Sequence, residues 1–347
     1  MDVAIIGATG SCGRQVAAQL IERGSLAESA TLHLIGHAGG QHETELWGLR
    51  ADLRDAFADR SPIIEVGTDV AQTNAGLVIM MAGATVTRET SDRAVLAATN
   101  RKIFAEATAG LARLSNNTTV IVQSNPVELA LQMLSEAVPR HCILGAAAWS
   151  DSLRFRRELA ADLSVTRPMV HAQMWGQHGD HLVPLWSTIE VPGISDQRLA
   201  DVIGLARQNR SLADLPAEIV AARTRALSLI ESGDVVDSYQ FIQGQPADIR
   251  AAIKPFFTHF TAGHTTELAT AHAVVDLADM VLGGHRRAIP AQVLLDGEHW
   301  GIHGVAAVGV LTGPTGWSQI VVEDIADDER AALSQAAKAI SVANSPQ

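Results

Sequence analysis

Short apolar runs alternate with segments of helical spacing through the first 150 residues. The run 77–81, Leu-Val-Ile-Met-Met, is apolar throughout, as expected of a parallel strand that is buried on both faces. Over 14–23, apolar residues recur at helical intervals and form one apolar face. This alternation predicts a parallel sheet with helices on both faces. The expected strands are 3–6, 31–35, 63–66, 77–81, 118–123 and 142–145, and the expected helices are 14–23, 43–57 and a segment through Asn100 to about Leu111.

The second half of the chain has longer helical patterns and a late group of strands. A helix is expected from Asp151 to about Leu163, and a capped helix is expected over 327–343. Apolar runs separated by glycine turns near the end of the chain predict an antiparallel sheet. We therefore expect an α/β protein, with a doubly wound parallel sheet over 1–146 and an α+β domain over 147–347. The other expected elements are helices over 216–232 and 262–282 and strands over 287–296, 303–311 and 318–323.

Composition excludes several classes of protein. A chain of 347 residues with 47% hydrophobic and 18% charged residues can bury a large core, so it is globular rather than disordered. The formal net charge of −12 argues against a nucleic-acid partner, because no basic stripe offsets it. No apolar run approaches the ~20 residues of a membrane span. The chain enters its first apolar strand without a signal region, so we expect a cytoplasmic protein without a membrane segment.

Cysteines and histidines give no metal or disulfide pattern. Cys12 and Cys142 form neither a disulfide framework nor a zinc motif. Histidine pairs at 178/181 and 299/303 have no carboxylate or cysteine to complete a metal site, so no metal is expected.

A glycine-rich turn lies between the first strand and the first helix. Its first glycine permits a tight turn, the second lets the backbone approach a pyrophosphate, and the third lets helix and strand pack closely. Phosphates would bind at the helix N-terminus, where main-chain N–H groups and the helix dipole favour an anion. This strand–turn–helix context predicts a Rossmann dinucleotide site rather than an ordinary turn. The candidate residues are Gly7, Ala8, Thr9, Gly10, Ser11, Cys12 and Gly13.

The end of the second strand bears on the choice between NAD and NADP. An acidic residue there would bind the ribose hydroxyls of NAD and repel the extra phosphate of NADP. The strand ends instead in Gly36 and His37, and neither Arg nor Lys occupies 36–42. We therefore expect NADP or NAD, with a slight preference for NADP or dual use. The alternative is that Gly36 simply shapes a turn.

Polar residues follow the later strands of the parallel sheet, where an α/β protein builds its ligand site. Arg88 and Arg93 lie in a polar loop after the fourth strand. Asn125 follows the fifth strand and precedes a proline that keeps it out of helical conformation. Asn100 and Gln123 are further candidates for cofactor contact. Each of these residues also has a plain alternative, such as a solvated first helical turn for Arg93 or a strand end for Asn125.

Three residues of the second half suggest acid–base chemistry. His178 lies between two glycines in the segment 176–180, Gly-Gln-His-Gly-Asp, and its unperturbed pKa is near neutrality. Asp151 and Arg154 are three residues apart on one side of a helix. Together they supply a carboxylate to orient an imidazole and a guanidinium to hold a substrate carboxylate through two hydrogen bonds. Taken singly, they could be a loop histidine and a surface ion pair.

These motifs occur in the order and spacing of the lactate/malate dehydrogenase family. The glycine turn, Ser124-Asn125-Pro126, the segment 151–156 and the segment 176–180 all resemble the family's motifs. The chain is most similar to the malate dehydrogenases of archaeal type, whose second strand also ends in Leu-Ile-Gly. The resemblance covers nearly the whole chain. It implies an NAD(P)-dependent L-2-hydroxyacid dehydrogenase that acts on a small 2-hydroxy or 2-oxo acid and forms homodimers or homotetramers.

The resemblance also implies roles for individual residues. His178 would be the catalytic acid and base, and Asp151 would be its partner. Arg154 would bind the substrate carboxylate, and Asn125 would contact substrate and nicotinamide. Arg93 resembles the mobile-loop arginine that polarises the substrate carbonyl. Thr266 lies in the region where the family has a Thr or Ser that lines the substrate pocket.

One loop departs from the family, whose malate-type members read Pro-Arg-Lys-x-Gly-Met-x-Arg. Here 85–93 is one residue longer and has neither the Pro nor the Gly. Counting from either end places Val86 or Thr87 at the position that selects the substrate, and only a shifted loop would bring Arg88 there. Malate and oxaloacetate are therefore the first expectation, and pyruvate or a specialised 2-oxo acid is the alternative.

Two other classes share the glycine turn. Short-chain reductases need Tyr-x-x-x-Lys, but the only tyrosine is Tyr239 and residue 243 is Gln, so the sequence excludes that mechanism. A non-catalytic nucleotide-binding regulator is the alternative from another class. Such a regulator would have no need of Arg93, Asn125, Asp151, Arg154 and His178 together.

Overall fold

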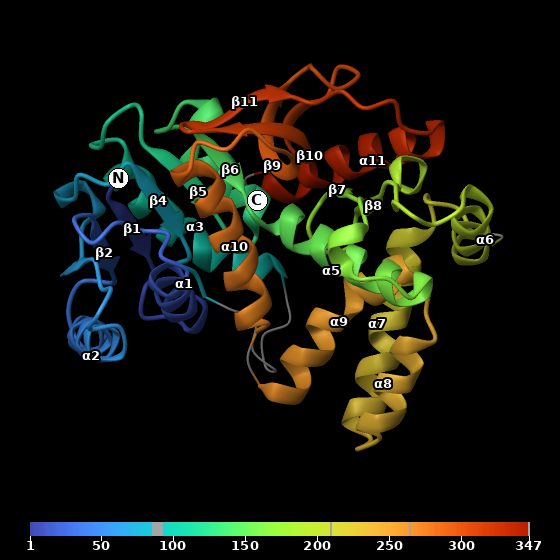
Figure 1. The fold of residues 1–347 in the computed structure, drawn as a ribbon, viewed down its shortest axis with the longest axis horizontal. Coiled ribbons are helices and arrows are strands. Elements are labelled where there is room, and N and C mark those ends of the chain that lie inside the picture. The colour runs from blue at the N-terminus through green and yellow to red at the C-terminus, as the bar shows by residue number, and fades with distance from the viewer. Residues whose placement is uncertain (85–92, 209, 264, 346–347) are drawn as a thin grey trace.

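The computed structural model describes residues 1–84, 93–208, 210–263 and 265–345, and for 93–96 it describes only the main chain. The described strands form one eleven-stranded sheet, in the order β3-β2-β1-β4-β5-β6-β9-β10-β7-β8, with β11 paired to β10 (Figure 1). The first six strands of this order are parallel and the remaining strands pair antiparallel. The expected α/β fold is confirmed.

The parallel part of the sheet confirms the expected doubly wound topology. The strands β4 and β5 lie near the centre and have only buried residues, because helices cover both of their faces. The strands are β1 (Val3–Ile6), β2 (Thr31–Ile35), β3 (Ile63–Gly67), β4 (Leu77–Met80), β5 (Thr119–Val122) and β6 (Ile143–Gly145). The helices are α1 (Ser11–Glu22), α2 (Gln41–Ala56), α3 (Arg93–Leu111) and α4 (Val127–Leu134).

The antiparallel part continues the same sheet. A pairing between Gly145 of β6 and Gln292 of β9 joins the two parts. A Cβ on Gly145 would lie 2.7 Å from the Oε1 of Gln292, so the junction needs glycine. The expected late strands are confirmed, although the last one covers 316–320 rather than 318–323. The strands are β7 (Met174–Gly176), β8 (Leu182–Pro184), β9 (Ala288–Asp296), β10 (His303–Gly313) and β11 (Gly316–Ile320).

The helices of the second half differ from the sequence-based expectation in three places. The helix expected from Asp151 begins four residues earlier, which places Asp151 in its second turn. The helix expected over 262–282 begins at Glu267, because Gly263 ends the preceding helix with a φ of +75°. Three helices, α6, α8 and α9, were not expected. The helices are α5 (Ala147–Leu163), α6 (Asp196–Arg207), α7 (Leu215–Glu231), α8 (Val235–Gln243), α9 (Ala247–Ala262), α10 (Glu267–Leu282) and α11 (Asp327–Asn344).

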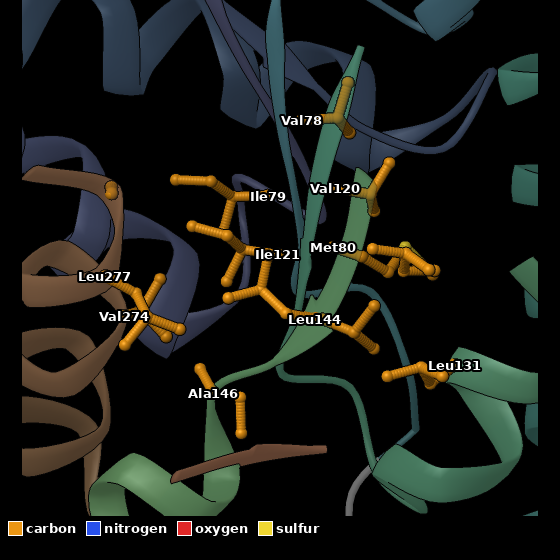
Figure 2. Packing of buried hydrophobic residues seen from close by; sticks show 14 of the residues in the cluster. Val78, Ile79, Met80, Val120, Ile121, Leu131, Leu144, Ala146, Val274 and Leu277 are labelled. Atoms are coloured by element: carbon orange, nitrogen blue, oxygen red, sulfur yellow. The ribbon is translucent and has the colours of Figure 1, made fainter. Parts of the chain in front are cut away.

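The main hydrophobic core includes residues from both halves of the chain. Helix α10 belongs to the second half but packs against α1 and the parallel sheet (Figure 1). Figure 2 shows Ile79 and Ile121 on the side of the sheet that faces Val274 and Leu277 of α10. All four side chains are fully buried. This packing ties the second half to the first, and the domain boundary at 146 stays a prediction.

A second core cluster lies among α5, α6, α7, α8 and α9. In Figure 1, α7, α8 and α9 gather at the end of the molecule away from β2 and α2. No helix within the described ranges is both long enough and apolar enough to span a bilayer.

The glycine turn between β1 and α1 has the geometry expected from its spacing. Gly7 has a φ of +88°, which side chains rarely allow, and a Cβ there would lie 2.6 Å from the Cα of Ala82. A Cβ on Gly13 would lie 2.3 Å from the carbonyl oxygen of Gly7. Helix α1 can therefore approach β1 this closely only because residue 13 has no side chain.

Gly13→Ala should lower the free energy of unfolding by about 2 kcal/mol or more, because the added methyl group would overlap backbone that cannot move away easily. Urea unfolding measures the change. Gly48→Ala is the matched control. Gly48 lies on the exposed face in the middle of α2, with open space around a Cβ. The free energy of unfolding of this variant should therefore rise by about 0.5–1 kcal/mol. Equal midpoints for Gly13→Ala and the parent protein would contradict the packing argument.

Candidate active site

His178 and Asp151 form a direct pair. The Nδ1 of His178 lies 2.7 Å from Oδ2 of Asp151. Asp151 comes from the second turn of α5, and His178 comes from the loop between β7 and β8. The side chain of Asp151 is 6% exposed and that of His178 is 26% exposed. The carboxylate is therefore buried behind an imidazole that still reaches solvent.

Glycines shape the loop that carries His178. Gly176 has a φ of +83° and Gly179 a φ of +116°. The N–H of Gln177 donates to the carbonyl of His181, and a Cβ on Gly176 would lie 2.6 Å from that same oxygen. The tight return of the chain from β7 to β8 therefore needs glycine at 176. The conformation of the turn therefore explains why glycines flank Gln177 and His178 in the segment 176–180.

Arg154 connects Asp151 to the start of α10. Its Nη1 donates to Oδ1 of Asp151 over 3.0 Å, and its Nη2 donates to the hydroxyl of Thr266 over 3.1 Å. The Thr266 hydroxyl lies 3.2 Å from that of Thr270, one turn further along the helix. The structure thus brings together four of the residues that the sequence singled out: Asp151, Arg154, His178 and Thr266.

The ionisation of the pair follows from its surroundings. Burial favours the neutral ring of His178, but the charge and hydrogen bond of Asp151, together with the charge of Glu128, outweigh burial and raise the pKa of His178. Burial likewise raises the pKa of Asp151, but His178 and Arg154 outweigh it, so the pKa of this carboxyl lies below its ordinary value. The resting state therefore contains a carboxylate that favours an imidazolium.

The N-terminus of α1 has the properties of an anion site. Gly10 is its N-cap residue and provides no side-chain cap for the N–H groups of the first turn, Ser11 to Gly13. The N–H groups of Gly7 and Ala8 both donate to the carbonyl of Ile35, at the end of β2. The N–H groups of Gly7 and Ala8 thus stabilise the turn, whereas those of the first turn of α1 have no side-chain cap, and cofactor contact by residues 7–13 stays a prediction.

Cys12, in the first turn of α1, lies near the start of α10, where Thr266 contacts Arg154. Burial, with the nearby charge of Glu267, raises the pKa of the Cys12 thiol to about 11. Glu267 directly follows Thr266, which contacts Arg154. The first turn of α1 and the start of α10 are therefore neighbours, and the two candidate sites meet there.

Asn125 and Asn100 are connected by a hydrogen bond, but only Asn125 is exposed. The Nδ2 of Asn100 donates to the carbonyl of Asn125 over 2.6 Å and to that of Ala84 over 3.1 Å. Its Oδ1 accepts from the N–H of Ala84 over 2.7 Å. Asn100 is fully buried and joins the ends of two loops, and its contact with a cofactor stays a prediction. Gln123 is buried as well, at 8% exposure.

The end of β2 shows why Gly36 is glycine. A Cβ on Gly36 would lie 3.0 Å from the Cδ1 of Leu46 in α2, so glycine at 36 leaves room for this side chain. His37 is exposed, and its Nδ1 lies 2.9 Å from the carbonyl of Ala38.

The side chains of two candidate arginines lie outside the described part of the structure. Arg88 lies outside the described residues, and Arg93 begins α3 but its side chain is likewise not described. Within the described ranges, no group of three or more His, Cys, Asp or Glu residues is arranged to hold a metal ion.

The structure adds two residues that sequence reasoning missed. Glu128, in the first turn of α4, accepts a hydrogen bond from the N–H of His178 over 2.8 Å. Arg223 of α7 pairs with Asp180 at 2.7 Å. Glu128 follows Asn125-Pro126 at the start of an apolar helix, where an acidic residue usually faces solvent. Only its position in an otherwise apolar turn could have indicated burial.

The dinucleotide-dependent oxidoreductases are the class of enzymes that these features define. They combine a doubly wound parallel sheet, a helix without a side-chain cap after a glycine turn, and a buried carboxylate–imidazole pair. Residues 1–142 match the model of the lactate/malate dehydrogenase NAD binding domain. The malate dehydrogenase of Methanothermobacter marburgensis is 26% identical over 342 residues, which are 97% of this chain and 94% of that protein. The L-lactate dehydrogenase A chain of Ambystoma mexicanum is 28% identical over 231 residues, 65% of this chain and 67% of that protein.

The fold agrees with these similarities. The crystal structure of Cryptosporidium parvum malate dehydrogenase matches with a TM-score of 0.74 and 20% identity, over 99% of this chain and 97% of that chain. The resemblance of the motifs to the lactate/malate dehydrogenase family is thus confirmed by the match of residues 1–142 and by these relatives.

Asp151→Asn should lower the free energy of unfolding by about 3 kcal/mol, because a buried cation loses its partner. The loss should depend on pH. The raised pKa of His178 stabilises the fold below the unfolded value of about 6.5, and this contribution disappears as pH rises through the folded pKa. The lowered pKa of Asp151 stabilises the fold above about 3.9 and is lost in acid.

The difference between Asp151→Asn and the parent protein should therefore be larger at pH 5.5 than at pH 9 in urea unfolding. Asp201→Asn is the control, since Asp201 is exposed and bonded to Gln197 on the surface of α6. Its effect should be small and the same at both pH values. A difference for Asp151→Asn that does not change with pH would refute the ionic description of the pair.

Proposed function

We propose that the protein is an NAD(P)-dependent L-2-hydroxyacid dehydrogenase, with malate and oxaloacetate as the first substrate pair. The observation that carries this proposal is the arrangement of His178, Asp151 and Arg154 beside the uncapped first turn of α1. In a chain whose first 142 residues match the NAD binding domain of the lactate/malate dehydrogenases, that arrangement supports transfer of a hydride and a proton to a 2-oxo acid.

The residues at the glycine turn fit a dinucleotide. The first turn of α1 offers main-chain N–H groups without a side-chain cap, and the exposed Gly10 before it has no side chain to cover them. A bound nicotinamide would supply or accept the hydride. The family model describes an NAD binding domain, so NAD is the cofactor of this proposal. The missing carboxylate at the end of β2 leaves NADP as the second cofactor to measure.

His178 would move the proton. Because its Nδ1 is bonded to Asp151, the transferable proton is on Nε2. In the reduction of a 2-oxo acid, the imidazolium donates this proton to the carbonyl oxygen, and in the reverse direction the neutral ring accepts it from the hydroxyl. Asp151 holds the ring orientation and stabilises the charged form. The raised pKa of His178 accordingly favours reduction at neutral pH.

Arg154 would bind the substrate carboxylate. Its two terminal nitrogens are held by Asp151 and Thr266, and each carries a second N–H group. A carboxylate can accept this pair in two parallel hydrogen bonds. The fixed guanidinium would thus place C2 of the substrate at a set distance from His178. Arg93 is proposed to polarise the carbonyl, and Asn125 to contact substrate and nicotinamide.

The proposal leaves two alternatives for the substrate group that lies opposite the C1 carboxylate. Arg88 could bind a second carboxylate, as malate requires. The longer loop over 85–93 favours the alternative of pyruvate or a specialised 2-oxo acid. We also propose that the protein assembles as a homodimer or homotetramer.

The test is a screen of oxaloacetate, pyruvate and bulkier 2-oxo acids with NADH and with NADPH, followed by nicotinamide absorbance. His178→Asn should reduce kcat by about 10²–10⁴-fold, because general acid–base catalysis is lost. The variant should still bind NADH, as measured by fluorescence. If the parent protein binds NADH but reduces no 2-oxo acid, the result would favour a non-catalytic nucleotide-binding regulator instead. A variant with near-normal kcat would remove His178 from the proposal.

Arg154→Lys should weaken substrate binding. Lys keeps the charge but cannot form two parallel bonds, and the loss of one charged hydrogen bond costs about 1.5–3 kcal/mol. We expect kcat/KM to fall about 10- to 100-fold. Arg156→Lys is a matched control on the same helix, because Arg156 packs over Trp149 and donates to the carbonyl of Ala172. Equal losses in both variants would show a general effect on α5 instead.

A further inference from the structure

Glu128 is a buried carboxylate that the proposed chemistry does not use. Its residue is 3% exposed, and its Oε1 accepts the main-chain N–H of His178 over 2.8 Å. It comes from the first turn of α4, three residues after Asn125. A carboxylate removed from water is costly unless other groups compensate, so its position beside the main chain of His178 calls for a physical explanation.

The hydrogen bond gives the first part of that explanation. The loop 176–180 turns sharply at its glycines, and its main-chain groups therefore need partners from other elements. Asp151 holds the ring of His178 through Nδ1, whereas Glu128 holds the same residue through its main-chain N–H. These two bonds come from different helices, α5 and α4, and constrain the ring and the main chain of His178.

Charge gives the second part. The titratable groups that face Glu128 are His178 and Asp151, while Arg154 acts on the ring from α5. Burial raises the pKa of Glu128, the repulsion of Asp151 adds to this, and the attraction of His178 opposes it. The carboxylate of Glu128 in turn raises the pKa of His178. The three groups therefore titrate as a coupled set.

We propose that Glu128 is a positioning residue of the His178 site, which holds the main chain of residue 178 and adds a second negative charge near the imidazole. The proposal rests on the proposed function for its catalytic meaning, but the pairing itself can be tested without turnover. In this proposal, two residues of the segment 125–128 contribute to the site. Asn125 is exposed at the end of β5, and Glu128 holds the residue that would face the same substrate.

Glu128→Gln separates the two parts of this role. Glutamine has nearly the same shape and its Oε1 can still accept the N–H of His178, but it has no charge. The pKa of His178 should fall by about 0.5–1 pH unit, because a buried negative charge near the ring is lost. Glu128→Leu removes the acceptor as well and should loosen the loop.

The first measurement is NMR titration of histidine-labelled protein without cofactor. The His178 signal, one of 13 histidines, is assigned from its loss in His178→Asn. Glu323→Gln is the matched control. Glu323 is another partly buried carboxylate whose pKa burial raises, but it bonds to Gln173 rather than to the His178 loop. It should leave the His178 titration unchanged within about 0.1–0.2 pH unit.

The second measurement is the pH profile of 2-oxo acid reduction. In Glu128→Gln the high-pH limb should move to lower pH by the same amount, with kcat/KM at low pH within about threefold of the parent protein. Glu128→Leu should lose about tenfold or more at every pH. A His178 titration in Glu128→Gln that superposes on the parent curve would overturn the charge role. Normal activity in Glu128→Leu would overturn the positioning role.

The two proposals can fail independently. If the parent protein reduces no 2-oxo acid, the proposed function fails, while the NMR titration still decides whether Glu128 and His178 are coupled. If the parent protein is active and the titration does not move, the charge role of Glu128 fails, and the activity of Glu128→Leu still decides the positioning role.

Discussion

The carboxylate of Asp151 is the interaction on which the site depends. Each of its oxygens has one partner, His178 on one side and Arg154 on the other. Because it is nearly fully buried, removal of its charge would leave a guanidinium and an imidazole close together with little water to screen them. One buried anion therefore sets the ring orientation, favours the charged ring and holds the group suited to bind a substrate carboxylate.

The position of that anion depends on packing between the two halves of the chain. Helix α5 begins directly after β6, the last parallel strand, so Asp151 lies about one turn from the sheet. Helix α10 packs its apolar face on β4 and β5 and starts at the threonine that contacts Arg154. The sheet is continuous through Gly145 and Gln292. The acid–base pair and the anion site of α1 are thus parts of one packed body.

The sequence predicted the parallel strands well, because a strand such as β4 is buried on both faces and reads as an uninterrupted apolar run. It predicted the meeting of Asp151, Arg154 and His178 through motif order. It did not predict α8 and α9, since α9 contains Pro255 and polar residues that pair with other helices, such as Arg250 with Glu158. Nor did it predict the contacts of Asn100, because its partners are main-chain groups 16 and 25 residues away, which no local pattern reveals.

The segment 176–180 shows how far a motif can go. Its glycines allow the turn, but glycine supplies no contact that would hold the turn in one conformation. Three side chains from outside the segment do so: Glu128 at the main chain of His178, Asp151 at the ring, and Arg223 at Asp180. A general acid must hold its proton within hydrogen-bond reach of the substrate, so a loop that only permits the geometry is insufficient. The precision of the site therefore resides in α4, α5 and α7, and the motif marks where they converge.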